Sequence, residues 1–231
     1  MNAQTASASA AKTALLFGLI VIWLMATLAG LWWFQQKNVR AFVGAGDDAA
    51  YWRAEEVEQR LQPLLQALPA AQPGQVTLLH FWNPGCLCNQ LSQRHFDALI
   101  HQFDASQLRI LVVAPASLSN DAEAEFNRLN GSRMTLVRET VFRSNHDETQ
   151  PGNQPQPQPL NLPASPAVAL FGADGKLGYF GAYGFGALCT VANDDFFPNI
   201  VRSLQTGHYG PFANVAGSGC FCAWPADQTN K

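Results

Sequence analysis

The sequence predicts an α/β domain, in which helices cover both faces of a mixed sheet, preceded by one transmembrane helix. Three observations lead to this fold class. An uncharged apolar stretch lies near the N-terminus. Short apolar runs bounded by turn residues then alternate with helical segments, as in α/β proteins. Finally, Asp174-Gly175 separates two further apolar runs, which predicts a β-hairpin within the same sheet.

Composition narrows the classes of protein to consider. The chain has 231 residues, enough for one ordinary domain and an appendage. Only 13% of residues are charged and the net charge is −3, which excludes a charged disordered tail protein and gives no basic field for nucleic acid. The sequence has no phosphate-binding glycine loop, nucleotide fingerprint or hydrolase nucleophile elbow. We therefore expect no cofactor and no nucleic-acid partner.

Residues 14–34, ALLFGLIVIWLMATLAGLWWF, are uncharged and long enough to cross a bilayer as one helix. Trp32 and Trp33 at the end of this stretch suit the aromatic belt of a membrane interface. A buried core helix and a cleaved signal peptide are the alternatives. The apolar stretch continues past the small-residue site at Thr27-Leu28-Ala29, which favours an uncleaved anchor in the lipid bilayer.

The orientation of this anchor rests on two signals that disagree. Lys12 lies before the apolar stretch, and Lys37 and Arg40 lie just after it, so the positive charges do not favour an N-inside orientation. The cysteine chemistry described below suits an oxidising compartment. We therefore expect a single-pass protein of the bacterial inner membrane, with its C-terminal domain in the periplasm.

The chain divides into five parts by composition. These are an N-terminal tail (1–13), the anchor (14–34), a linker with an amphipathic helix (35–74), the sheet domain (75–207) with a Pro/Gln-rich insertion loop (145–163), and a cysteine-containing tail (208–231). The helix of the linker is expected within residues 49–68, and Pro63 predicts a break or a kink near Gln62.

Apolar runs and turn residues place the elements of the sheet domain. Strands are expected at 75–82, 108–114, 134–137, 167–171 and 177–183, and helices at 89–103, 121–129 and 193–206. Cys86 follows the first strand and directly precedes a helix. Free backbone N–H groups and the positive end of the helix dipole favour a thiolate there. The thiolate is the attacking species in thiol–disulfide exchange, and a second thiol then resolves the mixed disulfide.

A strand that ends in Phe81-Trp82, followed by a short turn to Cys86 at a helix start, resembles the thioredoxin superfamily, particularly its membrane-anchored periplasmic members. That family also has a cis proline that faces the cysteines and opens the third strand, and Ser165-Pro166 matches it in sequence order. The resemblance covers about residues 75–206. It implies a thioredoxin-like sheet and thiol–disulfide exchange with protein thiols or disulfides, with an electron donor or acceptor that the sequence does not identify.

The sequence departs from the family pattern at two places. Its motif is Cys-x-Cys, so Cys88 falls one position early and Asn89 occupies the usual place of the second cysteine. A Cys86–Cys88 disulfide would close a small strained ring and be a stronger oxidant; alternatively, Cys88 is not the resolving thiol. His80 stands where the family often has a buried carboxylate. It would either exchange protons near neutral pH or be a hydrogen-bonded core histidine.

The residues and the resemblance together give each residue of this site an expected role. Cys86 is the expected nucleophile and Cys88 the first candidate for the resolving thiol, with Cys220 or Cys222 as the second. Pro166 and Ser165 would shape the substrate contact, Trp82 would pack against the site, and His80 would move protons.

The remaining cysteines leave three alternatives open. In the first, Cys220 and Cys222 form a second dithiol that exchanges with Cys86 and Cys88, or a tail bridge that shields those two cysteines. Otherwise they tie the tail to the domain, for example through Cys189, which is expected to be the odd buried thiol. In a metal-binding or metal-delivery protein, Cys86, Cys88, Cys220 and Cys222 would hold zinc, Cu(I) or an iron–sulfur cluster as thiolates. The third alternative is a non-catalytic structural or assembly domain.

Overall fold

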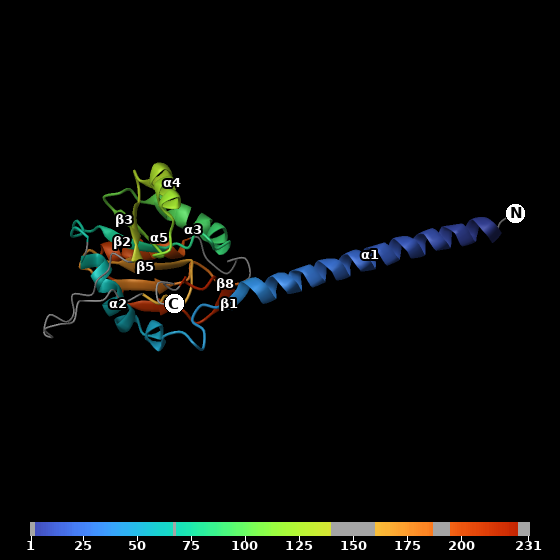
Figure 1. The fold of residues 1–231 in the computed structure, drawn as a ribbon, viewed down its shortest axis with the longest axis horizontal. Helices are drawn as coiled ribbons and strands as arrows, with labels where there is room; N and C mark the ends of the chain where they lie inside the picture. Colours follow the sequence, from blue (N-terminus) through green and yellow to red (C-terminus); the bar gives the residue numbers. More distant parts are fainter. Residues whose placement is uncertain (1–2, 67, 140–159, 187–194, 226–231) are drawn as a thin grey trace. The chain divides into compact units, whose positions relative to one another are not determined.

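The computed structural model describes residues 3–66, 68–139, 160–186 and 195–225 (Figure 1). The chain forms two compact units, Met1–Val39 and Arg40–Lys231. The first unit consists mainly of helix α1 (Ala3–Asn38). Its stretch Lys12–Lys37 is long and apolar enough to cross a membrane, a property that an uncleaved anchor shares with a signal sequence.

The second unit is built on a six-stranded mixed sheet, with the strand order β4-β3-β2-β5-β6-β7 among the described residues. The strands are β4 (Thr135–Arg138), β3 (Leu108–Ala114), β2 (Val76–Phe81), β5 (Ala167–Phe171), β6 (Leu177–Gly181) and β7 (Phe212–Asn214). Strand β2 runs parallel to β3 and antiparallel to β5, which forms the expected hairpin with β6. The predicted thioredoxin-like sheet is therefore confirmed.

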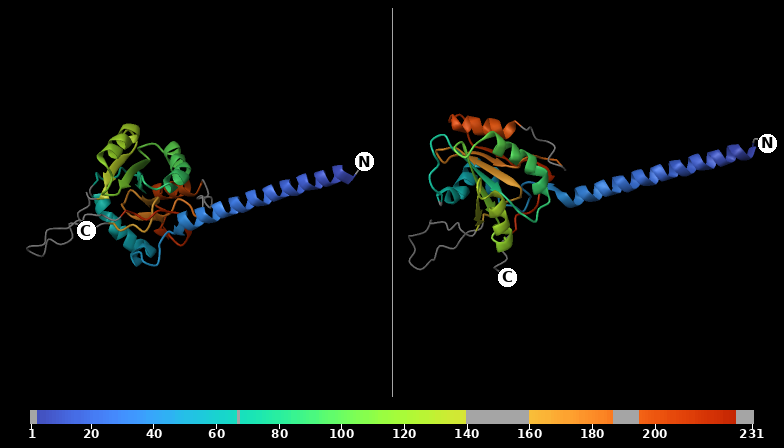
Figure 2. Two further views of the ribbon diagram at one scale, coloured as in Figure 1. Left: turned by 45° about the vertical axis from the view of Figure 1, so that its right-hand side comes forward. Right: turned by 90° about the horizontal axis from the view of Figure 1, so that it is seen from above.

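Helices cover both faces of this sheet, as Figure 2 shows from above. Alternate residues of a strand point to opposite faces. Leu79 and Phe81 of β2 therefore pack on the side of α2 (Ala54–Gln66), whereas Leu78 packs on the side of α3 (Cys88–Gln102) and α5 (Phe196–Gln205). Strands β2, β5 and β6 are buried along their whole length, which explains why their sequences are continuous apolar runs.

Short elements complete the second unit. Asp48 caps the 3₁₀-helix η1 (Ala49–Trp52), and Ser119 caps α4 (Asn120–Asn130) by accepting the Ala122 N–H at 3.2 Å. Strands β1 (Val39–Ala41) and β8 (Ser218–Cys220) form a separate two-stranded sheet.

The helix of residues 49–68 differs from its prediction. It begins only at Ala54, after η1. Of the break or kink expected near Gln62, the break is wrong because α2 continues through Pro63 to Gln66. Leu61 and Leu64, on either side of the proline, are both fully buried in the core, and their burial offsets the missing backbone hydrogen bond. Most of the expected insertion, 145–163, lies outside the described residues.

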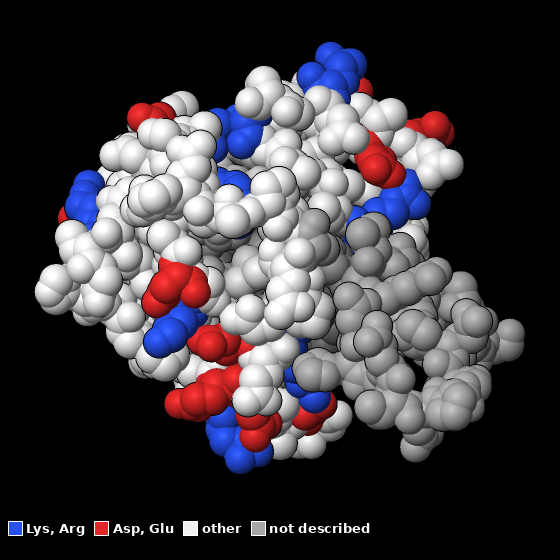
Figure 3. All heavy atoms as spheres, turned by 90° about the vertical axis from the view of Figure 1, so that its left-hand side faces the viewer, with Lys and Arg blue, Asp and Glu red and all other residues white. Residues whose placement is uncertain are grey.

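Acidic and basic side chains lie interspersed on the described surface in Figure 3. Several form ion pairs, including Arg138 with Glu123 and Arg60 with Asp48. Ion pairs that solvent still reaches contribute little to stability individually. The hydrophobic core and the disulfides described below therefore hold the fold.

Gly181 provides a test of the sheet edge. Its φ is +153°, and an added Cβ would lie 2.1 Å from the backbone oxygen of Asn214, its partner in β7. We expect Gly181→Ala to lower the free energy of unfolding by at least about 2 kcal/mol, measured by urea denaturation. Gly210→Ala is the matched control, because no atom lies within 4 Å of its Cβ position. Equal stability of the two variants would show that β7 does not pair with β6.

Candidate functional site

The candidate site begins at the turn between β2 and α3. The backbone oxygen of Asn83 accepts the Cys86 N–H at 2.9 Å, and the Asn83 side-chain oxygen accepts the Gly85 N–H at 3.1 Å. Pro84 and Gly85 suit such a turn. The chain then enters α3 through Leu87, so Cys86 lies just before a 15-residue helix, as predicted.

The register of the sheet brings a second segment beside Cys86. Phe81 in β2 pairs with Ala167 in β5, so the residues just before β5 lie next to those just after β2. The Ser165–Pro166 peptide bond is cis, and the Ser165 backbone oxygen lies 3.7 Å from the Cys86 sulfur. Ser165 and Pro166 therefore lie where the resemblance predicts them.

Two disulfides join this turn to the C-terminal segment. Cys86 is bonded to Cys222, with their Cα atoms 5.8 Å apart, and Cys88 is bonded to Cys220, with their Cα atoms 5.5 Å apart. The structure thus pairs each cysteine of the first Cys-x-Cys with one of the second, and forms no bridge within either motif.

Local geometry explains why the two motifs match. Side chains at i and i+2 of an extended segment point to the same side, so Cys220 and Cys222 both face the start of α3. Phe221 between them points the other way and packs edge-on against Phe42, with 5.2 Å between the ring centroids. The equal spacing of the two motifs fits this pairing, but the spacing alone does not specify which cysteines are bonded.

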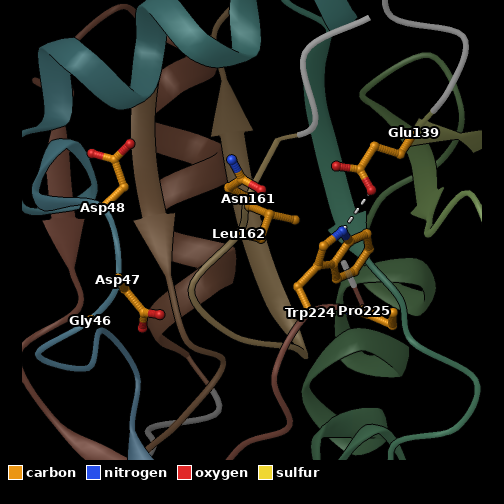
Figure 4. Close-up of a pocket in the computed structure, with 8 residues that line it drawn as sticks. All are labelled: Gly46, Asp47, Asp48, Glu139, Asn161, Leu162, Trp224 and Pro225. Carbon is orange, nitrogen blue, oxygen red and sulfur yellow. Dashed lines mark hydrogen bonds between the residues drawn. The ribbon is translucent and has the colours of Figure 1, made fainter. Parts of the chain in front are cut away.

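Further contacts hold the C-terminal segment in place. Trp224 is buried, packs against Phe81 and donates its indole N–H to Glu139 at 2.8 Å (Figure 4). The other Glu139 oxygen accepts the Leu160 N–H at 2.6 Å. Sequence reasoning missed Glu139 and Trp224, because neither residue belongs to a motif of the family that the chain resembles.

The cavity in Figure 4 has a volume of about 430 Å³ and three carboxylates among its lining residues. Each carboxylate already has partners within the protein. Asp47 pairs with Arg40, Asp48 pairs with Arg60, and Glu139 holds Trp224. Because all three carboxylates already have partners within the protein, we place the candidate site at the disulfides and not in this cavity.

His80 lies in the core between β2 and α3. Its ring stacks on Phe96 at 4.5 Å, and Nδ1 forms a 2.9 Å hydrogen bond with the Tyr183 hydroxyl. Burial lowers the pKa of His80 to about 3, so its ring is uncharged at neutral pH. These are the contacts of a packing residue, and a role in proton transfer stays a prediction.

The structure describes the surroundings of Trp82 and Asn89, but not those of Cys189. Trp82 is partly buried and packs against Phe126 of α4, with 5.2 Å between the ring centroids. Asn89, at the usual place of the second cysteine, donates its backbone N–H to the Cys86 oxygen at 3.1 Å. Cys189 lies outside the described residues.

The sulfurs also define which residues could hold a metal ion. Those of Cys86, Cys88 and Cys222 lie within 4.8 Å of one another. In the bridged state, however, each sulfur is already bonded to another sulfur and is not a thiolate. The donor set would fit a thiophilic metal only after both bridges had been reduced.

Comparison with known protein families places this site in context. A family model described as a domain of unknown function, DUF6436, matches residues 53–224. The chain belongs to the DUF6436 family. The matched region contains all four bridged cysteines, the cis proline and Trp224, and it begins after α1. No curated protein matches the chain.

Solved structures include several that resemble the DUF6436 chain. A secreted disulfide oxidoreductase from Mycobacterium tuberculosis is 18% identical, with a TM-score of 0.35 over 56% of this chain and 82% of that one. A thiol-disulfide isomerase from Corynebacterium glutamicum is 15% identical, with a TM-score of 0.38 over 58% and 82%. A hypothetical protein from Sinorhizobium meliloti is 10% identical, with a TM-score of 0.45 over 67% and 82%.

The burial of His80 predicts acid sensitivity. Its pKa is about 3 in the folded chain and 6.5 in the unfolded chain, so the unfolded state binds more protons between these values. The stability from this group is full above pH 6.5 and falls by up to about 1.4 kcal/mol per pH unit as the pH drops toward 3. We expect His80→Phe to flatten this slope in urea unfolding measured from pH 7 to pH 4.

A matched control for His80 is His101→Gln, which changes an exposed histidine near the end of α3. This variant should keep the slope of the unaltered protein. A slope that His80→Phe leaves unchanged would show that His80 is not the buried neutral group described above.

Proposed function

We propose that the protein is a membrane-anchored thiol–disulfide oxidoreductase that acts on protein thiols or disulfides outside the cytoplasm. The observation that carries this proposal is the position of the Cys86–Cys222 bridge. Cys86 lies just before the N-terminal end of α3 and beside the cis Ser165–Pro166 peptide, and its partner sulfur belongs to a separate segment of chain.

The site has the parts that reversible exchange needs. The N-terminal end of α3 stabilises a Cys86 thiolate, and Cys222 supplies the second sulfur of the pair. In one direction, two substrate thiols become a disulfide while the Cys86–Cys222 bridge becomes two thiols; an electron acceptor then restores the bridge. In the other direction, the two thiols reduce a substrate disulfide and an electron donor regenerates them.

Cys222, and not Cys88, is the second sulfur of the proposed redox pair with Cys86. Cys88 is bonded to Cys220, and both residues are buried. The second bridge would therefore hold the C-terminal segment beside Cys86 during exchange.

The proposed location is the bacterial inner membrane with the domain in the periplasm. Disulfides persist in oxidising compartments, and two of them lie in this domain. The apolar α1 supplies the anchor.

Replacement of Cys86 tests the proposed activity. We expect Cys86→Ser to lower exchange with a model protein disulfide to the rate without protein, because the variant lacks the sulfur on which the reaction depends. Cys189→Ser is the control and should keep the activity, since the proposed reaction does not use Cys189. Wild-type turnover by Cys86→Ser would refute the assignment.

Labelling of intact cells tests the location. A thiol reagent that cannot cross the inner membrane, added after a reductant, should label the domain in cells whose outer membrane has been made permeable. The cytoplasmic control is a soluble protein with an exposed cysteine, which should stay unlabelled. Labelling of the domain only after lysis of the inner membrane would place it in the cytoplasm.

A further inference from the structure

The C-terminal segment occupies the candidate site like an added strand. Cys222 donates its backbone N–H to the Ser165 oxygen at 2.8 Å and accepts the Ser165 N–H at 2.9 Å. The Asn83 side chain reaches the Ala223 oxygen at 3.5 Å. Backbone hydrogen bonds thus flank the Cys86–Cys222 bridge and hold Cys222 in a fixed position.

The four bridged cysteines differ in their accessibility. Cys86 is 3% exposed, Cys88 2% and Cys220 0%, whereas Cys222 is only partly buried. An incoming thiolate must reach the sulfur that it attacks. Cys222 is therefore the one residue of the two bridges that offers solvent access.

The surroundings of Cys86 also favour attack on Cys222 over attack on Cys86. Its sulfur lies 3.7 Å from the Ser165 oxygen, in space that the chain already fills. A sulfur leaves faster when its thiolate is more stable. The N-terminal end of α3 gives Cys86 this stabilisation, whereas Cys222 lies in an extended segment without a helix of its own.

We infer that Cys222 is the sulfur that an external thiolate attacks in the oxidised protein, and that Cys86 is the sulfur that leaves. This inference rests on the proposed function and specifies its first step. A bond forms between the incoming sulfur and Cys222 while the Cys86–Cys222 bond breaks. The electron pair of that bond and the negative charge pass to Cys86, so the step needs no proton.

The same geometry determines the second step. The Cys88–Cys220 bridge, two residues from Cys222, and the Trp224–Glu139 hydrogen bond keep the opened segment close to Cys86. The Cys86 thiolate can then attack Cys222 again and release the incoming thiol. Alternatively, a second substrate thiol attacks the substrate sulfur of the mixed disulfide, which releases a substrate disulfide and leaves Cys222 as a thiol.

The experiment identifies the sulfur that carries the first adduct. The oxidised full chain in detergent is mixed with 2-mercaptoethanol, quenched at short times with N-ethylmaleimide, digested at acidic pH, and mapped by tandem mass spectrometry. We expect mercaptoethanol on Cys222 and maleimide on Cys86. Mercaptoethanol on Cys86, Cys88 or Cys220 as the first adduct would overturn the inference.

Two matched double variants separate the bridges. Cys88→Ala/Cys220→Ala keeps only the Cys86–Cys222 bridge and should show the same adduct on Cys222. Cys86→Ser/Cys222→Ser keeps only the buried Cys88–Cys220 bridge and should react at least about tenfold more slowly, because neither sulfur is accessible. Equal rates for the two variants would contradict the role of accessibility.

These measurements also distinguish a failure of the inference from a failure of the proposed function. If the protein exchanges with a model protein disulfide but its first adduct forms on Cys86, only the inference fails. If it neither exchanges nor forms an adduct on any of the four cysteines, both fail.

Discussion

The two disulfides between the start of α3 and the C-terminal segment are the constraint on which the rest of the site depends. Cys86 and Cys222 are 136 residues apart in sequence, and in the chain-entropy model a loop of this length stabilises the fold by about 5 kcal/mol. Once the Cys86–Cys222 bridge has formed, the Cys88–Cys220 bridge closes a loop of only a few residues. For such a loop the same model gives roughly 2 kcal/mol of stabilisation. Most of this stabilisation therefore survives the opening of either bridge, which leaves one of them available for chemistry.

The C-terminal segment is part of the domain core as well as part of the site. Phe221 and Trp224 pack into the cluster on the α2 side of the sheet, and β7 pairs with β6 at the sheet edge. Apolar burial of this kind holds the segment even when no covalent bond does. The sulfur of Cys222 is thus positioned by the core of the domain and is not carried on a free tail.

Much of the fold could be predicted from the sequence, because β2, β3 and β5 are buried on both faces and appear as continuous apolar runs. The Asp174-Gly175 turn, the start of α3 near Cys86 and the cis Ser165–Pro166 bond also followed from local residues or from the family resemblance. The cross-pairing of the cysteines did not, since connectivity depends on which distant segments the sheet brings together. Strand β7 is three residues long, and Glu139 holds Trp224 across 85 positions, so neither leaves a periodic signal.

Linkage between folding and disulfide formation biases the four cysteines toward the oxidised state. Because the bridges stabilise the folded chain, the folded chain stabilises the bridges by the same free energy. A strained ring within Cys86-Leu87-Cys88 would have the opposite bias, toward the reduced state. In the bridged structure the sulfurs of Cys86, Cys88 and Cys222 lie within 4.8 Å of one another. Reduction would leave neighbouring thiol groups there, and ionisation of one thiol opposes ionisation of the next. Bridge formation relieves this repulsion, as would a bound thiophilic metal, so the oxidation state of these four sulfurs decides which chemistry the site can carry out.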